Sequence, residues 1–377
     1  MIQSIWEDNR IILTLDAGGT NFVFSAIQAG KEITKPIELP TSTDSLDAII
    51  GTIINGFTSL IDLLDQEPYA ISFAFPGPAD YPKGIIGDLP NLPAFRGGVA
   101  LKPVLENKFD IPVFVNNDGN LFAYGEAIAG FLPYVNGALK KRNNIKQYHN
   151  LVGLTLGTGF GGGIVRNKEL LIGDNSNASE VWSLQDFEKQ YSFIEESISI
   201  RAIKREYLKI LDGNSSNANN LSPKDIFELV ENGTEKQKEA AKLSFERFGR
   251  ALGQAIANIV TIIDGLIVLG GGISNAYKLF MPACMEVLNG KMKSYNGEEK
   301  PRLPLRFYDI EDSEDFNTFL KGQQKRISVP FSNQQIEYDS EKRVAIGKSV
   351  LGTSKASAIG AYAFALSQLN KKQQYHT

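Results

Sequence analysis

The residues best suited to chemistry in this chain lie in two glycine- and threonine-bearing turns, each directly after an apolar strand-like run. The first is Asp16-Ala-Gly18-Gly19-Thr20-Asn21, and the second is Gly157-Thr158-Gly159. A glycine's missing Cβ lets backbone N–H groups approach a ligand, and the threonine hydroxyl adds one more donor. Such donors suit phosphate oxygens. The pair of turns therefore predicts one nucleotide gripped by two halves of the protein.

Asp16 ends the first apolar run, just before the glycines. A carboxylate there could hold a hydrated Mg²⁺ near terminal phosphates, since Mg²⁺ prefers one or two carboxylates, waters and phosphate oxygens. The alternative is an ordinary hairpin turn, because Asp and Gly are common turn residues. The second turn at 157–163 favours the phosphate interpretation.

Asn117 and Asp118 follow the apolar run 112–115 and precede a helical pattern that starts at Leu121. In open α/β sheets the carboxyl ends of strands line the ligand crevice. There, Asp118 could take a proton from a substrate hydroxyl as it attacks phosphorus, while Asn117 orients that hydroxyl. The alternative is a helix N-cap, for which both residue types are favoured.

Gly270-Gly271-Gly272 follows the buried-type strand 266–269 and precedes another helix. The glycines could let that helix approach an adenosine or its phosphates closely, or they could simply form a tight turn. Neither this turn nor the one at 157 is a Walker A loop, because no Lys-Ser/Thr pair follows.

Strand-like and helix-like segments alternate along the chain, which is typical of an α/β protein. At 377 residues two domains are expected. A helix is predicted over 45–64, with apolar residues at helical spacing. Residues 300–350, rich in charge and with short apolar runs, are interpreted as a β-rich or irregular insertion.

Composition excludes several classes of protein. The net charge is −4, so no excess of Lys or Arg is available to neutralise nucleic-acid phosphates. The single cysteine, Cys284, excludes an intramolecular disulfide and a Cys-rich zinc site. No apolar run reaches the roughly 20 residues that span a bilayer. We therefore expect a soluble cytoplasmic protein with no nucleic-acid or membrane partner.

Six motifs, in order, resemble those of the ROK family, which joins repressors and sugar kinases within the sugar kinase/Hsp70/actin superfamily. They are Asp16–Asn21, Pro76-Gly77, Asn91–Pro93, Asn117–Asn120, Leu156–Gly163 and Leu269–Gly272. The resemblance implies an α/β, two-domain actin-like ATPase fold (ribonuclease H-like) with an active-site cleft between the domains. The expected domains are 1–132 plus 353–377, completed by the C-terminal helix, and 133–352, with the insertion at about 300–350.

The resemblance also implies roles for individual residues. Asp118 resembles the catalytic base, and Asp16 would hold Mg²⁺ through water and ATP. The expected sugar-binding residues are Gly77, Asn91, Asn117, Asp118, Glu180 and Glu195. The expected ATP-binding residues are Asp16, Gly18, Gly19, Thr20, Asn21, Gly157, Thr158, Gly159, Gly271 and Gly272. By local sequence alone, Glu180 and Glu195 look like ordinary surface glutamates.

The chain departs from the family pattern at one motif. Where the family has Glu-x-Gly-His, this chain has Glu180-Val-Trp182-Ser183, and the cysteine cluster that follows is absent. We therefore expect ATP and Mg²⁺ but no zinc. Trp182 either packs against the sugar or fills the space of the missing zinc lobe.

The expected activity is ATP-dependent phosphorylation of a hexose or N-acetylhexosamine hydroxyl, and a homodimer is a candidate assembly. The alternatives are a sugar-responsive transcriptional regulator and a non-catalytic sugar sensor. Only ten residues precede the first strand-like run, which disfavours direct DNA binding.

Overall fold

The computed structural model describes residues 4–17, 21–41, 45–88, 93–189, 191–211 and 221–374. The chain divides into two compact units. The first unit comprises residues 1–130, 163–178 and 351–377, and the second comprises 131–162 and 179–350. Within the described residues, no helix combines the length and apolarity that crossing a bilayer requires.

The first unit is built on a six-stranded sheet of order β3-β2-β1-β5-β9, with β4 paired to β2. β1 runs parallel to β5, and β5 runs parallel to β9, so the carboxyl ends of these three strands share one edge. The strands are β1 (Ile12–Ala17), β2 (Asn21–Gln28), β3 (Lys31–Glu32), β4 (Ile37–Pro40), β5 (Ala70–Ala74) and β9 (Val113–Asn116).

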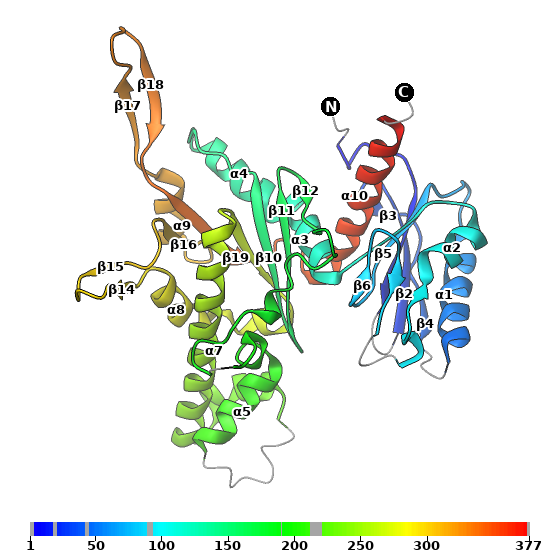
Figure 1. The fold of residues 1–377 in the computed structure, drawn as a ribbon, viewed down its shortest axis with the longest axis horizontal. Coiled ribbons are helices and arrows are strands. Elements are labelled where there is room, and N and C mark those ends of the chain that lie inside the picture. The colour runs from blue at the N-terminus through cyan, green and yellow to red at the C-terminus, as the bar shows by residue number, and fades with distance from the viewer. Residues whose placement is uncertain are drawn as a thin grey trace. The chain divides into compact units, whose positions relative to one another are not determined.

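Helices cover both faces of this sheet (Figure 1). On one face lie α1 (Leu46–Ile61) and α2 (Leu101–Phe109); on the other lie α3 (Asp118–Ile128) and α10 (Thr353–Gln374). α1 begins at its N-cap Ser45, whose hydroxyl accepts from the Ala48 N–H, and it buries Ile53 and Phe57 against the sheet. The helix predicted over 45–64 is confirmed. A small three-stranded sheet, β6 (Ala79–Asp80), β7 (Ile85–Ile86) and β8 (Val99–Ala100), lies in the same unit.

The second sheet has the order β12-β11-β10-β13-β19-β16. β10 and β13 are parallel neighbours, which places the turns that follow them at one edge. The strands are β10 (Asn150–Leu156), β11 (Phe160–Arg166), β12 (Glu169–Leu170), β13 (Leu266–Gly270), β16 (Arg306–Asp309) and β19 (Arg343–Lys348). The helices of the second unit are α4 (Phe131–Lys141), α5 (Ile200–Ile210), α6 (Pro223–Asn232), α7 (Glu235–Ile262), α8 (Tyr277–Leu288) and α9 (Ser313–Lys321).

Residues 300–350 are not a separate insertion throughout. β16 and β19 pair in parallel within the second sheet, and β19 also pairs with β13. Between them, α9 is followed by the hairpin of β17 (Gln324–Ser328) and β18 (Gln335–Asp339), which projects from the second unit as an arm (Figure 1). A second hairpin, β14 (Lys291–Lys293) with β15 (Glu299–Pro301), follows α8. The expected β-rich character holds, but the ends of the segment belong to the core.

Candidate active site

The carboxyl edge of the first sheet brings together four of the predicted site residues. Asp16 lies at the end of β1, Gly77 follows β5, and Asn117 and Asp118 follow β9. These three strands are adjacent and parallel. The carboxyl ends of parallel strands are where α/β proteins bind ligands. The topology therefore brings together residues from Asp16 to Asp118, which are 102 positions apart in sequence.

The capping interpretation of Asn117 is confirmed, and the catalytic interpretation of Asp118 stays a prediction. Asn117 is the N-cap of α3, and its Oδ1 accepts from the Gly119 N–H at 2.8 Å. Asp118 is the first residue of the helix, and its Oδ1 accepts from the same N–H at 2.8 Å. The Asp118 side chain is exposed to solvent. Because Asn117 supplies the cap, the Asp118 carboxylate is available for chemistry at the sheet edge.

The pKa of Asp16 is raised by its surroundings and by the charge of Asp118. Partial burial of the Asp16 carboxyl raises its pKa, and the nearby Asp118 carboxylate raises it further. The side chain still has one solvent-facing side, so the protein around it removes only part of its hydration. Two like charges at one edge favour a bound cation, and carboxylate oxygens are ligands that Mg²⁺ accepts. The residues present therefore fit a magnesium ion.

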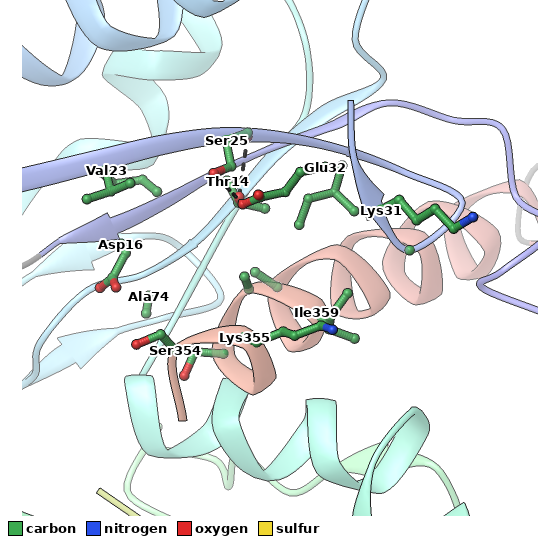
Figure 2. Close-up of a pocket in the computed structure, with 16 residues that line it drawn as sticks. Thr14, Asp16, Val23, Ser25, Lys31, Glu32, Ala74, Ser354, Lys355 and Ile359 are labelled. Atoms are coloured by element: carbon green, nitrogen blue, oxygen red, sulfur yellow. Dashed lines mark hydrogen bonds between the residues drawn. The ribbon is translucent and has the colours of Figure 1, made fainter. Parts of the chain in front are cut away.

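A cavity of about 560 Å³ lies beside Asp16, between β1–β2 and α10 (Figure 2). Asp16 and Ser354 lie toward one end of it, and Lys31 toward the other. In its wall the Thr14 hydroxyl donates to the Ser25 carbonyl at 3.3 Å. From the first turn of α10, Ser354 lies toward the Asp16 end of the cavity, and the Lys355 side chain extends along the helix toward Ile359.

Tyr81 was not singled out from the sequence, but it contacts the predicted site residue Asn117. Its hydroxyl donates to the Phe75 carbonyl at 3.1 Å and lies 3.4 Å from the side-chain nitrogen of Asn117. A Cβ at Gly77 would lie 2.9 Å from the same hydroxyl. Tyr81 therefore ties the turn after β5 to the cap of α3. The only sequence signal was its place after Pro76-Gly77-Pro78, a turn that needs an anchor.

The two glycine turns of the second unit are neighbours. Gly157, Thr158 and Gly159 connect β10 to β11, and Gly271 and Gly272 follow β13. Gly271 has φ of 86°, a left-handed conformation that favours glycine, and a Cβ there would overlap the backbone of Leu156. The close approach of the Gly271 and Leu156 backbone segments is by itself a sufficient reason for glycine at position 271, with no ligand needed. It also leaves both turns at one edge of the sheet.

Glu195 reaches the turn after β10. Its Oε2 accepts from the Phe160 N–H at 3.0 Å, and its Oε1 accepts from Arg201 at 3.1 Å. A Cβ at Gly159 would overlap Oε2. The missing Cβ of Gly159 therefore leaves room for the Glu195 carboxylate in its present position. Arg201 is a second residue missed from sequence, since its pairing with Glu195 depends on how η3 (Ile194–Glu196) meets α5.

Glu180 lies at the start of η2 (Val181–Ser183), beside β11. Its Oε2 accepts a hydrogen bond from the indole N–H of Trp182. Glu180 is therefore not a freely solvated surface glutamate. The two sequence-based alternatives for Trp182 stay predictions, and the structure shows the Trp182 indole in contact with Glu180.

Some predicted site residues lie outside the described residues, namely Gly18, Gly19, Thr20 and Asn91. Asn21 opens β2 and is exposed. Among the described residues, no group of three His, Cys, Asp or Glu side chains is arranged to hold a metal ion. The expected absence of zinc stays a prediction.

A model of the ROK family matches residues 12–303. The chain belongs to the ROK family. The resemblance drawn from the six motifs is thereby confirmed. N-acetyl-D-glucosamine kinase of Escherichia coli is 27% identical over 281 residues, which cover 69% of this chain and 83% of that relative.

Solved structures of the family share the fold. A glucokinase from Parabacteroides distasonis is 47% identical, with a TM-score of 0.87, covering 97% of this chain and 99% of that one. A ROK hexokinase from Thermus thermophilus has a TM-score of 0.63 at 18% identity, covering 94% and 97%, and this likeness shows the fold alone. The expected two-domain actin-like α/β fold is confirmed.

Proposed function

We propose that this sugar kinase of the ROK family transfers the γ-phosphoryl group of ATP to a hydroxyl of a hexose, with glucose as the favoured acceptor. The observation that carries the proposal is the 47% identity to the Parabacteroides distasonis glucokinase over 97% of the chain. The more distant relative that phosphorylates an amino sugar, at 27% identity, makes N-acetylglucosamine the competing acceptor.

Asp118 is the proposed general base. A sugar hydroxyl at the carboxyl edge of the first sheet would give its proton to the Asp118 carboxylate as its oxygen attacks the γ-phosphorus and the bond to ADP breaks. The exposed carboxylate at the first position of α3 supports this role, since Asn117 provides the N-cap. Asn117 and Gly77, joined through Tyr81, would position the acceptor.

Asp16 is the proposed carboxylate for Mg²⁺, held through water and the ATP phosphates. The ion, when bound, neutralises charge on the transferring phosphoryl group. In the second unit, the turns at 157–159 and 271–272 would hold the phosphates and adenosine, with backbone N–H groups as donors. Glu180 and Glu195 would accept hydrogen bonds from sugar hydroxyls, which an ionised carboxylate does well.

The test is a coupled ADP-release assay with purified protein, Mg²⁺-ATP and glucose, fructose, mannose, allose, N-acetylglucosamine and N-acetylmannosamine. We expect the highest kcat/KM with glucose and recovery of a glucose phosphate. A higher kcat/KM with N-acetylglucosamine would overturn the choice of acceptor. Sugar binding without ADP release from any of the six would indicate the sensor or regulator alternative and overturn the kinase proposal.

A further inference from the structure

The two glutamates proposed to bind the sugar flank a short lobe of the second unit. Glu180 precedes η2, and Glu195 lies in η3. Backbone hydrogen bonds close the segment between them: Ile194 N donates to the Leu184 carbonyl at 2.7 Å, and Asp186 N donates to the Ser192 carbonyl at 2.9 Å. These bonds bring η2 and η3 together.

Trp182 lies at the surface of this lobe, outside the buried core. Its ring meets the ring of Phe193 edge-on, with centroids 5.3 Å apart and an interplanar angle of 63°. Trp182 is 38% exposed and Phe193 is 55% exposed. Edge-to-face aromatic pairs contribute beyond the area that they bury, so the pair can hold the indole in one orientation at the surface.

The indole N–H is directed at Glu180. It donates to Oε2 of the carboxylate, while the Ser183 hydroxyl donates to the Glu180 carbonyl at 2.8 Å. Trp182 thus holds the Glu180 side chain, and Ser183 holds the Glu180 backbone. Ser183 takes the position of the family motif's histidine, and its hydroxyl is engaged with the backbone rather than directed at a ligand.

This arrangement suits sugar recognition. An ionised carboxylate only accepts hydrogen bonds, and its two oxygens offer about four acceptor positions. The indole takes one position on Oε2, which leaves others for hydroxyl donors. A glutamate already held in place loses less rotamer freedom when a ligand binds, which improves affinity.

We propose that Trp182 is a positioning residue for the sugar: its N–H orients the Glu180 carboxylate, and Phe193 holds its ring. The proposal rests on the proposed function, since it assigns Glu180 to the hexose. Trp182 takes no part in phosphoryl transfer. Its loss should therefore weaken sugar binding and leave ATP binding and the chemical step intact.

The first experiment separates the N–H from the ring. Trp182→Phe keeps an aromatic ring and removes the donor, so we expect KM for glucose to rise about tenfold, with kcat and KM for ATP within about twofold of wild type. Trp182→His retains an N–H donor and should recover part of the loss. Phe187→Leu is the matched control, because Phe187 is 59% exposed in the same lobe. An unchanged KM for glucose in Trp182→Phe, or a lower kcat without a rise in KM, would overturn the proposal.

The second experiment observes Trp182 directly. The chain has two tryptophans, Trp6 and Trp182, so Trp6→Phe leaves one reporter. We expect glucose to change the emission of Trp6→Phe protein and to leave that of Trp182→Phe protein unchanged. An active Trp6→Phe kinase with no emission change at saturating glucose would overturn the Trp182 proposal and leave the kinase proposal standing. A glucose-dependent emission change in a protein that phosphorylates no sugar would overturn the kinase proposal and leave the Trp182 proposal standing.

Discussion

Asp118 raises the pKa of Asp16 across the carboxyl edge of the first sheet. Burial of the Asp16 carboxyl is the larger cause, and the Asp118 charge is the second. The two residues come from β1 and from the first position of α3, 102 residues apart in sequence. Like charges are placed together at a cost in stability where function requires them.

Asp118→Asn should stabilise the protein at neutral pH. Removing the Asp118 charge removes one cause that disfavours ionised Asp16. We expect the free energy of unfolding to rise by less than about 1 kcal/mol, because both side chains face solvent and water screens their interaction. Urea denaturation at pH 7 without Mg²⁺ measures it, with the exposed Asp65→Asn as control. A lower urea midpoint for Asp118→Asn alone would contradict the prediction.

The raised pKa of Asp16 should also make the free energy of unfolding depend on pH. Since the Asp16 pKa is raised above its ordinary value of 3.8, the folded state binds more protons than the unfolded state between those two values. Stability contributed by this group is therefore present at low pH and lost as pH rises through the raised pKa. Asparagine does not titrate, so Asp16→Asn should not show that loss. The unfolding free energy of the variant should therefore increase relative to that of wild type from pH 4 to pH 7. A constant difference would count against the pairing.

Asp118→Asn should also abolish catalysis while preserving the fold. Asparagine keeps the shape of the side chain and can accept from the Gly119 N–H, but it cannot take the acceptor's proton. We expect kcat with glucose to fall at least about 100-fold, with KM for ATP little changed. Asp110→Asn is the matched control, because Asp110 is the C-cap of α2 with φ of 54°, a conformation that asparagine adopts well. Near-wild-type kcat in Asp118→Asn would remove it from the mechanism.

Gly271 and Gly272 offer a matched pair that separates folding from ATP binding. A Cβ at Gly271 would overlap Leu156 and its φ is 86°, whereas a Cβ at Gly272 would meet nothing within 4 Å. We expect Gly271→Ala to lower the free energy of unfolding by at least about 1–2 kcal/mol and Gly272→Ala to change it little. If adenosine lies against this turn, Gly272→Ala should raise KM for ATP without a change in Tm. Thermal unfolding and ATP titrations in parallel distinguish the two effects.

The Glu126 side chain lies between two segment ends of the first unit, one near residue 130 and one at residue 351. Its buried carboxylate accepts from the Leu351 N–H at 3.0 Å, and a Cβ at Gly130 would overlap its Oε2. The first segment of the unit ends at 130 and its last segment begins at 351, so one carboxylate contacts both of these ends. We expect Gly130→Ala to cost about 1–3 kcal/mol of unfolding free energy.

The control for Gly130→Ala is Gly137→Ala in α4, where a Cβ would meet nothing within 4 Å. Alanine is the better helix former by about 1 kcal/mol, so this variant should be equally or more stable. Both proteins can be compared in one urea series. Equal stability of Gly130→Ala and wild type would show that the Glu126 carboxylate yields easily.

Features encoded over short distances were predictable. The helix at 46–61 follows from apolar residues three and four positions apart and a serine cap. The turn at 157–159 and the Asn117-Asp118 pair follow from an apolar run that stops at residues with special backbone or capping roles. Their places at strand ends depend on the chain's local order alone, so the sequence was sufficient for them.

The place of β16 and β19 in the second sheet was not predictable in the same way. Arg306–Asp309 carries charge at both ends, and its partner Arg343–Lys348 lies beyond an exposed arm. Parallel strands are joined by long connections rather than by a tight turn, so the sequence of one strand does not indicate which segment pairs with it. Only the packed sheet shows that these two short runs extend the core of the second unit.

The sequence by itself determined which residues could do chemistry, because residue type and strand–turn–helix order are local properties. The tertiary structure alone decided what those residues contact. The Asp118 charge acts on Asp16, the Asn117 amide donates to the Tyr81 hydroxyl, Glu195 accepts from the Phe160 N–H, and Glu180 accepts from the Trp182 indole. These are through-space contacts. They arise when strands pair in parallel and loops close over an edge, and distance along the chain does not encode them.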